Sequence, residues 1–275
     1  MTATGASTPK VVLVTGASSG IGAEVARLFA QRGHTVYGTS RHPDKVADPI
    51  PAVRYVRLDN ADYAVAAECA AEVGPIDILV NNAGESQAGA LEDTPMDAIE
   101  HLFAVNVFGP IALTKAVLPG MRERRRGTVV MVGSMLSSFP VAFRSNYAAT
   151  KSALKAYALA TRREVAPYGI RMIAVEPGTI ATGIGDRRSV YVADESVYRG
   201  EYETLAAATR RNEDDGISAS AMAQVIVDAA LAEHPKPFYA KGNRAEIVFL
   251  LRRLVPRQLI LDLTARTHGL RRIKF

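Results

Sequence analysis

The sequence predicts an α/β fold built on a doubly wound parallel sheet. Short runs rich in valine, isoleucine and leucine alternate along the chain with longer segments of helical periodicity. This alternation is typical of parallel strands joined by crossover helices. Such crossovers are right-handed, so helices cover both faces of the sheet. Apolar residues make up 48% of the 275 residues, which suits a large core.

The elements can be read in order from periodicity and from the residues that end them. Gly33 follows the first helix and Pro119-Gly120 follows the third, and both residue types are usual just beyond a helix end. The predicted strands are Lys10–Thr15, His34–Ser40, Val53–Leu58, Ile76–Val80, Thr128–Val132 and Arg171–Val175. The predicted helices are Ala23–Arg32, Ala64–Val73, Met96–Leu118 and Tyr147–Ala166.

Polar or glycine-containing clusters follow the predicted strands at their carboxyl ends. They stand at Gly16, Ser40, Asp59, Asn82, Ser134 and Pro177. Ligands of open parallel sheets bind outside the carboxyl ends of the strands. The sequence therefore predicts one ligand site along this edge of the sheet.

Both ends of the chain and one internal segment depart from this rhythm. Residues 1–9 are small and polar and predict a loose tail, so residues 10–275 are expected to form a single domain. Residues 179–218 are charged, contain several tyrosines and follow a strand end, which favours a substrate lid. The helical extension 244–275 contains eight lysines and arginines and two acidic residues. Its net charge is therefore +6, whereas the rest of the chain has a net charge of −1.

This basic extension allows three interpretations. Its arginines can lie on the solvent-exposed face of a terminal helix, it can pack against the body or another subunit, or it can bind an anionic membrane. No nucleic-acid-binding module accompanies it, so no nucleic-acid partner is expected. Cys69 is the chain's one cysteine and has no metal-ligand spacing around it, and no long uncharged apolar run is present. These features favour a cytoplasmic protein without a metal site.

A glycine-rich turn joins the first strand to the first helix. Its sequence, Thr15-Gly16-Ala17-Ser18-Ser19-Gly20-Ile21-Gly22, has the spacing G-x-x-x-G-x-G. Gly16 permits a tight turn, while Gly20 and Gly22 let the backbone approach a pyrophosphate at the helix N-terminus. The strand–turn–helix context therefore predicts a dinucleotide-binding Rossmann fold.

Tyr147 and Lys151 are four residues apart within a predicted helix. They therefore share one face and lie one turn from each other. An ammonium group close to a phenol stabilises the phenolate, so such a tyrosine can exchange a proton near neutral pH. The spacing predicts an acid in reduction and a base in oxidation.

Together these features resemble the short-chain dehydrogenase/reductase family. The resemblance covers Lys10 to Thr182 and consists, in order, of Thr15–Gly22, Asn81–Gly84, Asn106, Ser134 and Tyr147–Lys151. It implies an enzyme that moves a hydride between a nicotinamide cofactor and a carbonyl or alcohol carbon. It also implies that Ser134 hydrogen-bonds the substrate oxygen, that Lys151 binds the nicotinamide ribose, and that Asn106 holds a water that passes the proton out.

The resemblance further implies the residues that bind the cofactor. Asp59 contacts adenine, Asn82 and Ala83 support the adenosine side, and Pro177, Gly178, Ile180 and Thr182 orient the nicotinamide. With the turn, the second strand end and the catalytic pair, the expected set is Gly16, Ser18, Ser19, Gly20, Ile21, Gly22, Ser40, Arg41, Asp59, Asn82, Ala83, Gly84, Tyr147, Lys151, Pro177, Gly178, Ile180 and Thr182.

The end of the second strand predicts NADP(H) rather than NAD(H). An NAD site usually has an acidic residue there for the ribose 2′-hydroxyl, but this chain has Ser40 and Arg41. A guanidinium suits a 2′-phosphate, with Ser18 and Ser40 as hydroxyl donors. The alternative is that Arg41 is a surface residue and that both cofactors are accepted.

Substrate specificity is expected from a mixed apolar and polar pocket. Its predicted lining is Glu85, Gln87, Phe139, Val141, Phe143 and the segment Tyr191–Leu205. The C-terminal stretches Phe238–Gly242 and Phe249–Pro256 are similar to bacterial relatives of 17β-hydroxysteroid and retinol dehydrogenases. This similarity implies a medium-sized hydrophobic ketone, aldehyde or alcohol.

The sequence is also compatible with two alternative functions, and it predicts an oligomer. A 3-oxoacyl carrier-protein reductase shares the core motifs and needs a basic docking patch, for which Arg122, Arg124, Arg125 and Arg126 are available. A catalytically idle dinucleotide-binding regulator is a further possibility, although idle relatives usually lack the tyrosine or lysine. The family usually forms dimers or tetramers through the two long helices, so a homo-oligomer is expected.

Overall fold

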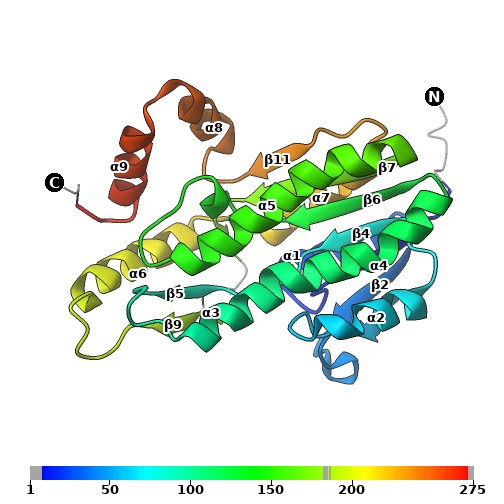
Figure 1. The fold of residues 1–275 in the computed structure, drawn as a ribbon, viewed down its shortest axis with the longest axis horizontal. Helices are drawn as coiled ribbons and strands as arrows, with labels where there is room; N and C mark the ends of the chain where they lie inside the picture. The colour runs from blue at the N-terminus through cyan, green and yellow to red at the C-terminus, as the bar shows by residue number, and fades with distance from the viewer. Residues whose placement is uncertain (1–7, 182–184, 186, 272–275) are drawn as a thin grey trace.

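A seven-stranded parallel sheet forms the centre of the computed structural model, which describes residues 8–181, 185 and 187–271 (Figure 1). Its strands lie in the order β11-β7-β6-β4-β1-β2-β3. They are β1 Val11–Val14, β2 Thr35–Ser40, β3 Val53–Arg57, β4 Ile78–Asn81, β6 Gly127–Val132, β7 Ile170–Pro177 and β11 Phe238–Lys241. All neighbouring strands pair in parallel. The predicted doubly wound α/β fold is confirmed.

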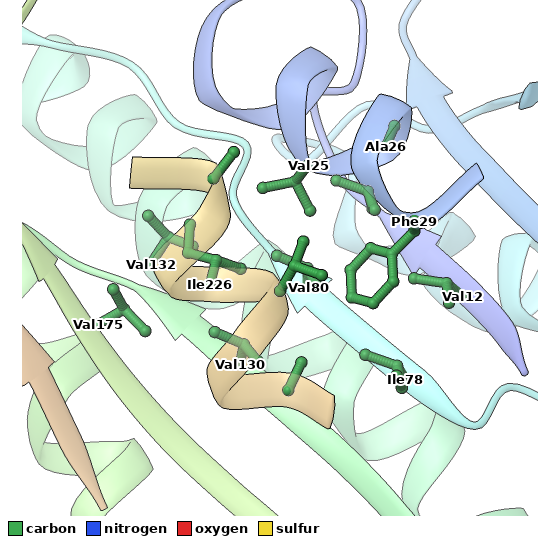
Figure 2. Close-up of a cluster of buried hydrophobic side chains, with 14 of the residues drawn as sticks. Val12, Val25, Ala26, Phe29, Ile78, Val80, Val130, Val132, Val175 and Ile226 are labelled. Atoms are coloured by element: carbon green, nitrogen blue, oxygen red, sulfur yellow. The ribbon is translucent and has the colours of Figure 1, made fainter. Parts of the chain in front are cut away.

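Helices pack against both faces of this sheet through two layers of buried apolar side chains. On one face, Phe29 of α1 (Gly20–Gln31) and Ile226 of α7 (Ala219–Leu231) pack against strand residues such as Val80, and all three are fully buried (Figure 2). The other face is covered by α2 (Ala66–Val73), α4 (Gly109–Glu123) and α5 (Ser145–Val165). The strands are apolar on both faces because both faces are covered.

The third predicted helix is longer than expected and is interrupted. It consists of α3 (Met96–Phe103), a π-helical turn (Ala104–Phe108) and α4, which continues past Pro119-Gly120 to Glu123. The prediction of a stop at Pro119 is wrong. Pro119 is exposed, so water can solvate the carbonyl that it leaves free, while the next turn buries Met121 completely. The segment is also apolar and long enough to cross a bilayer, but half of its most apolar stretch is buried, as in a core helix.

The carboxyl ends of the central strands lie level with one another. Val14 pairs with both Gly38 and Val80, and Val80 pairs with Val130. The strand order reverses between β1 and β4, and such a reversal opens a crevice at the carboxyl edge. Gly16 and Asn82 therefore follow their strands on the two sides of this crevice.

A second group of elements lies beyond that edge, away from the N-terminus (Figure 1). Short parallel pairs join β5 (Gln87–Gly89) to β9 (Ser189–Tyr191) and β8 (Ile180–Ala181) to β10 (Ile217–Ser218). The helices there are α6 (Arg199–Asp214), α8 (Ala245–Leu254) and α9 (Arg257–Thr267). Short 3₁₀ turns occur at Pro43–Lys45, Tyr63–Val65, Met135–Ser137 and Ala166–Tyr168.

The C-terminal helices have their own small core. Met135, Phe139, Ala245 and Ile260 are buried together. Phe249 of α8 meets the ring of Phe139 at 5.1 Å and that of Phe238 at 5.2 Å between centroids. Helices α8 and α9 of the basic extension are thus packed against the body, in agreement with one of the three interpretations.

Candidate active site

A cavity of about 1720 Å³ runs along the carboxyl edge of the sheet. Most of the predicted site residues line it: Gly16, Ser18, Ser19, Gly20, Ile21, Ser40, Arg41, Asp59, Asn82, Ala83, Gly84, Ser134, Tyr147, Lys151, Pro177, Gly178 and Ile180. Gly22 and Asn106 lie behind this lining. Thr182 lies outside the described residues. Residues spread over most of the chain are therefore brought to one cavity.

The glycine-rich turn is held by close backbone packing. Gly16 has φ +65°, a conformation that L side chains rarely adopt, and its N–H donates to Thr39 Oγ1 at 3.2 Å. A Cβ on Gly22 would lie 2.3 Å from the Gly16 carbonyl oxygen and 2.4 Å from Asn82 Nδ2. Glycine is required at both positions because the backbone leaves no room.

Thr15 fastens the turn to the end of β4. Its hydroxyl oxygen accepts hydrogen bonds from the backbone N–H groups of Asn82 at 3.0 Å and Ala83 at 2.9 Å. The Asn82 side chain returns a bond to the Thr15 carbonyl at 3.0 Å. These bonds fix the two sides of the crevice relative to each other.

The N-terminus of α1 is free to bind an anion. Ser19 precedes the helix with extended backbone, no side chain of the described residues caps the helix, and its first turn has no acidic residue. Unpaired N–H groups at a helix start, with the helix dipole, favour a phosphate group. Across the cavity, Arg187 donates to Ser19 Oγ at 3.1 Å.

At the end of β2, Ser40 and Arg41 line the cavity, and the sequence has no Asp or Glu among residues 25–43. Ser40 Oγ accepts from the His42 N–H at 3.2 Å. Arg41 Nη1 lies 3.7 Å from Glu85 Oε1, and the Arg41 side chain is 65% exposed. An ion pair this exposed is weak, so Arg41 can turn to another anion at little cost. Asp59 accepts from the Ala61 N–H at 3.0 Å.

Tyr147 and Lys151 lie on one face of α5, as their spacing predicted. Lys151 is only 4% exposed and donates from Nζ to the Val132 carbonyl at 3.2 Å. The ammonium nitrogen is 5.9 Å from the centroid of the Tyr147 ring. The charge is thus held beside the phenol, with one backbone partner at the end of β6.

Asn106 links this pair to the end of β4 through the π-helical turn. The side chain is fully buried, its Nδ2 donates to the Glu85 carbonyl at 3.0 Å, and its Oδ1 accepts from the Glu85 N–H at 2.8 Å. A Cβ on Gly84 would lie 2.9 Å from Asn106 Oδ1 and 3.1 Å from Lys151 Nζ. The extra residue of a π turn turns Asn106 inward, and such turns often mark functional sites.

Ser134 begins the 3₁₀ turn that follows β6. Its hydroxyl oxygen accepts from the Leu136 N–H at 3.2 Å, so the hydroxyl proton can be donated into the cavity. A buried network supports this turn from below: Glu176, which is fully buried, accepts from Ser138 at 2.8 Å and pairs with Lys155 at 2.8 Å.

Two arginines beside Tyr147 were missed from the sequence. Arg144 and Arg188 both line the cavity and both donate to Ser86 Oγ, at 3.0 and 3.2 Å. Burial, followed by the charge of Arg188, lowers the pKa of Arg144 to about 10. Arg144 lies one helical turn before Tyr147, and this spacing could have predicted from the sequence that Arg144 lies near the catalytic tyrosine.

The substrate side of the cavity differs from the prediction. Glu85, Phe139 and Val141 line it, but Gln87, Phe143 and Tyr191–Leu205 do not. The prediction is wrong for Gln87 because its side chain is buried in bonds to Ala98 and Asn146. Phe143 instead packs edge to face against Tyr202. The walls come from later residues: Thr209, Asn212 and Glu213 of α6, Ile247, Val248 and Leu251 of α8, and Ile260, Leu263, Thr264, Thr267 and His268 near the C-terminus.

The arginine cluster at the end of α4 lies far from this cavity. Arg124 donates to the Ile76 carbonyl at 2.7 Å, Arg125 to the Pro167 carbonyl at 2.9 Å, and Arg126 pairs with Asp77 at 3.5 Å. Residue 127 begins β6, so the cluster is at the amino edge of the sheet. These side chains fasten loops of the body.

Comparison with known proteins gives one family. The family model described as short chain dehydrogenase matches residues 10–190. The 3-ketodihydrosphingosine reductase of Bacteroides thetaiotaomicron is 30% identical, over 88% of this chain and 91% of that protein. The dehydrogenase/reductase SDR family member 7B of Rattus norvegicus is 35% identical, over 96% of this chain and 83% of its own.

Solved structures agree with this relationship. A short-chain dehydrogenase from Streptomyces avermitilis superposes with a TM-score of 0.77 at 37% identity, covering 90% of this chain and 93% of its own. The closed form of a serine dehydrogenase complexed with NADP+ superposes with a TM-score of 0.70 at 27% identity, covering 84% and 94%.

Proposed function

Since the chain belongs to the short-chain dehydrogenase/reductase family and is an oxidoreductase, we propose that it uses NADP(H) to interconvert a ketone or aldehyde and an alcohol. The observation that carries this proposal is the placement of Tyr147 and Lys151 in the cavity, next to the residues that follow β4 and β6. The nicotinamide, when bound, supplies or accepts the hydride. The protein supplies the proton and the geometry.

The residues at the carboxyl edge fit a dinucleotide. The free N-terminus of α1 and the turn Gly16–Gly22 would hold the pyrophosphate. Asp59, Asn82, Ala83 and Gly84 would hold the adenosine side, and Pro177, Gly178, Ile180 and Thr182 the nicotinamide side. The donors Ser18, Ser40 and Arg41 support a preference for NADP(H), because a 2′-phosphate needs cationic and hydroxyl donors. A relative of known structure is complexed with NADP+.

In reduction, Tyr147 would donate a proton to the substrate oxygen, and in oxidation it would accept one. Lys151, held beside the ring, would stabilise the phenolate and bind the ribose. Ser134 would donate its free proton to the substrate oxygen as negative charge develops there. Asn106 would hold the water through which the proton leaves.

The far walls of the cavity support a medium-sized hydrophobic substrate. Ile247, Leu251 and Leu263 line it and remain partly exposed to solvent, at 58%, 41% and 43%. An apolar substrate that covers them gains their burial. Residues 10–275 would act as one domain in which 179–218 is the lid, since Arg187 and Arg188 reach across the cavity to Ser19 and Ser86.

Replacing Tyr147 with phenylalanine tests the proposal. NADPH oxidation is followed with a panel of ketones, aldehydes, steroids and acyl thioesters. The variant should lower kcat about a thousandfold for the best substrate, because general acid catalysis is lost, while the Kd for NADPH stays within about twofold. Undiminished turnover would contradict the proposal, and dinucleotide binding without any turnover in the wild type would favour the idle regulator.

The carrier-protein reductase alternative has little support here. Its docking patch was expected at Arg122–Arg126, but three of these arginines bind the body at the opposite edge of the sheet. Turnover of an acyl carrier-protein thioester much above that of the free thioester would restore it.

We also propose a cytoplasmic homo-oligomer with peripheral membrane contact. Two apolar side chains of α5, Tyr157 and Leu159, are exposed, at 48% and 40%, which suits a subunit interface through this helix. Leu250, Leu254 and Leu259 are exposed beside Arg252, Arg253 and Arg257, a pattern that suits an anionic bilayer. The intact protein should co-sediment with phosphatidylglycerol vesicles and lose this on deletion of 257–275. Absence of the intact protein from the pellet would end the membrane proposal.

A further inference from the structure

Arg144 and Arg188 come from distant parts of the chain and meet at one hydroxyl. Arg144 precedes α5, and Arg188 lies directly before β9. Their guanidinium groups donate to the same oxygen, Ser86 Oγ, at 3.0 and 3.2 Å. Ser86 is 4% exposed and Arg144 is 7% exposed, so the meeting point is buried in the cavity wall.

Within the part of the chain that the structure describes, this cluster carries an excess of positive charge. Arg188 forms an ion pair with Glu213, which also lies close enough to act on Arg144. Counted over these described residues, two guanidinium groups and one carboxylate leave a net charge of +1. With a pKa of about 10, Arg144 stays charged at neutral pH. A buried charge needs a partner of opposite sign.

Arg144 also has N–H groups that are not used in hydrogen bonds within the described residues. Its guanidinium offers five N–H groups. Among the described residues, its hydrogen-bond partner is Ser86, and the buried Nε has none. One face of the guanidinium covers the Tyr147 ring, with Cζ 4.8 Å from the centroid. Buried donors of this kind usually have a ligand or water to account for them.

The residue next to Arg188 in the sequence, Arg187, makes its contact in a different part of the cavity, where the cofactor phosphates are expected. Arg187 reaches Ser19 at the N-terminus of α1, whereas Arg188 reaches Ser86 beyond the end of β4. The two consecutive side chains thus reach different parts of the cavity lining, one at the start of α1 and the other beyond β4. A ligand at Arg144 and Arg188 lies on the side of Tyr147, where the substrate reacts.

We propose that Arg144, Arg188 and Ser86 form a subsite for a carboxylate of the substrate, held next to the carbon that reacts. This inference rests on the proposed function and names its substrate class: an oxo acid or hydroxy acid whose carboxylate is a short carbon chain away from the reacting carbon. The planar carboxylate matches the guanidinium fork and neutralises the spare charge. The apolar end of the molecule then extends toward Ile247, Leu251 and Leu263.

A matched pair of substrates tests the subsite. NADPH oxidation is measured with 3-oxooctanoate and with its uncharged methyl ester. Wild-type kcat/KM should be at least about tenfold higher for the acid. Arg144→Met should lower the value for the acid about tenfold to a hundredfold and leave the ester within about threefold, whereas Arg144→Lys should restore part of the loss. Arg211→Gln, at an exposed position of α6 outside the cavity lining, is the control and should leave the acid-to-ester ratio unchanged.

A structural role for the same arginines predicts a different result. If they only clamp α6 and the segment before β9 to the body, Arg144→Met should reduce turnover of acid and ester equally. That result would overturn the subsite. Equal wild-type turnover of acid and ester, or turnover of neutral ketones alone, would also overturn it while leaving the proposed function intact.

Binding without turnover separates this inference from the proposed function. Calorimetric titration in the presence of NADP+ compares octanoate with octanamide, which has the same shape without the charge. Octanoate should bind the wild type at least about tenfold more tightly than octanamide, and Arg144→Met should remove the difference. Equal affinities for the two probes would overturn the subsite even if no substrate were ever turned over.

Discussion

The two sides of the cavity are built in different ways. On the dinucleotide side, the lining that follows β1, β2 and β4 is made of strand ends, glycines and short polar side chains that are fixed by hydrogen bonds to the backbone. On the substrate side, much of the lining comes from side chains of α6, α8 and α9, several of which are partly exposed. The first side has no room for larger side chains, whereas single side chains on the second side can be replaced without disturbing the backbone. We therefore expect substitutions on the first side to affect folding and cofactor binding, and those on the second to affect substrate choice.

The largest effect is expected for Gly22→Ala. The new Cβ would lie 2.3 Å from the Gly16 carbonyl oxygen, in a turn that cannot move without breaking the bonds of Thr15. The free energy of unfolding should fall by about 3 kcal/mol, and the Kd for NADPH should rise more than about tenfold. Chemical denaturation and a fluorescence titration measure the two quantities.

Gly200→Ala is the matched control on the other side. Gly200 is an exposed residue of α6 with nothing within 4 Å of its added Cβ. Alanine favours a helix over glycine, so stability should stay the same or rise by about 0.5 kcal/mol. Similar losses in both variants would contradict the distinction between the two sides.

Arg41→Ala should produce the next largest effect. A guanidinium hydrogen bond to a phosphate is lost, so kcat/KM with NADPH should fall about tenfold while the value with NADH changes by less than about twofold. The Arg41–Glu85 pair is too exposed to matter for stability, and the unfolding transition should not move. A wild type that uses NADH as well as NADPH would show that Arg41 is only a surface residue.

Leu251→Ser should change substrate affinity alone. Leu251 lines the cavity and is 41% exposed, so an apolar substrate can cover it. Losing this contact should raise KM for a hydrophobic ketone about fivefold, since about 1 kcal/mol of apolar burial is removed. The Kd for NADPH and kcat should stay the same.

Leu254→Ser, one turn further along α8, provides the comparison. Leu254 is 73% exposed and does not line the cavity. Its replacement should leave KM unchanged within about twofold. An equal rise in KM for both variants would mean that α8 affects the site through its position and not through contact with the substrate.

The same difference explains what the sequence could predict. Tyr147 and Lys151 are four residues apart on one helix, and Gly16, Gly20 and Gly22 lie in one turn, so short-range spacing is enough to place them. Arg144 and Arg188 are far apart in sequence and meet only because the chain crosses the sheet between them. Ile260 of α9 reaches the cavity because it is buried together with Met135, Phe139 and Ala245, and Phe249 anchors α8 on Phe139 and Phe238. Amphipathic periodicity predicted such a helix but could not say which of its apolar residues would face the body. The predicted helix end at Pro119 was wrong for a similar reason, because the burial of Met121 outweighs the local signal.

The smallest effect is expected for Cys69, on the sheet-facing side of α2 in the dinucleotide half. The thiol is 3% exposed, and burial together with the nearby Glu72 raises its pKa to about 11. At pH 8 the reactive thiolate should be rarer than in an ordinary cysteine by about a hundredfold or more. Because the chain has one cysteine, labelling with a disulfide reagent reports this position alone. The native protein at pH 8 should react at least about a hundredfold more slowly than the protein in guanidinium chloride, and it should keep its activity. Rapid labelling of the native chain would mean that α2 opens readily, and the dinucleotide side would then lack the rigidity that distinguishes it from the substrate side.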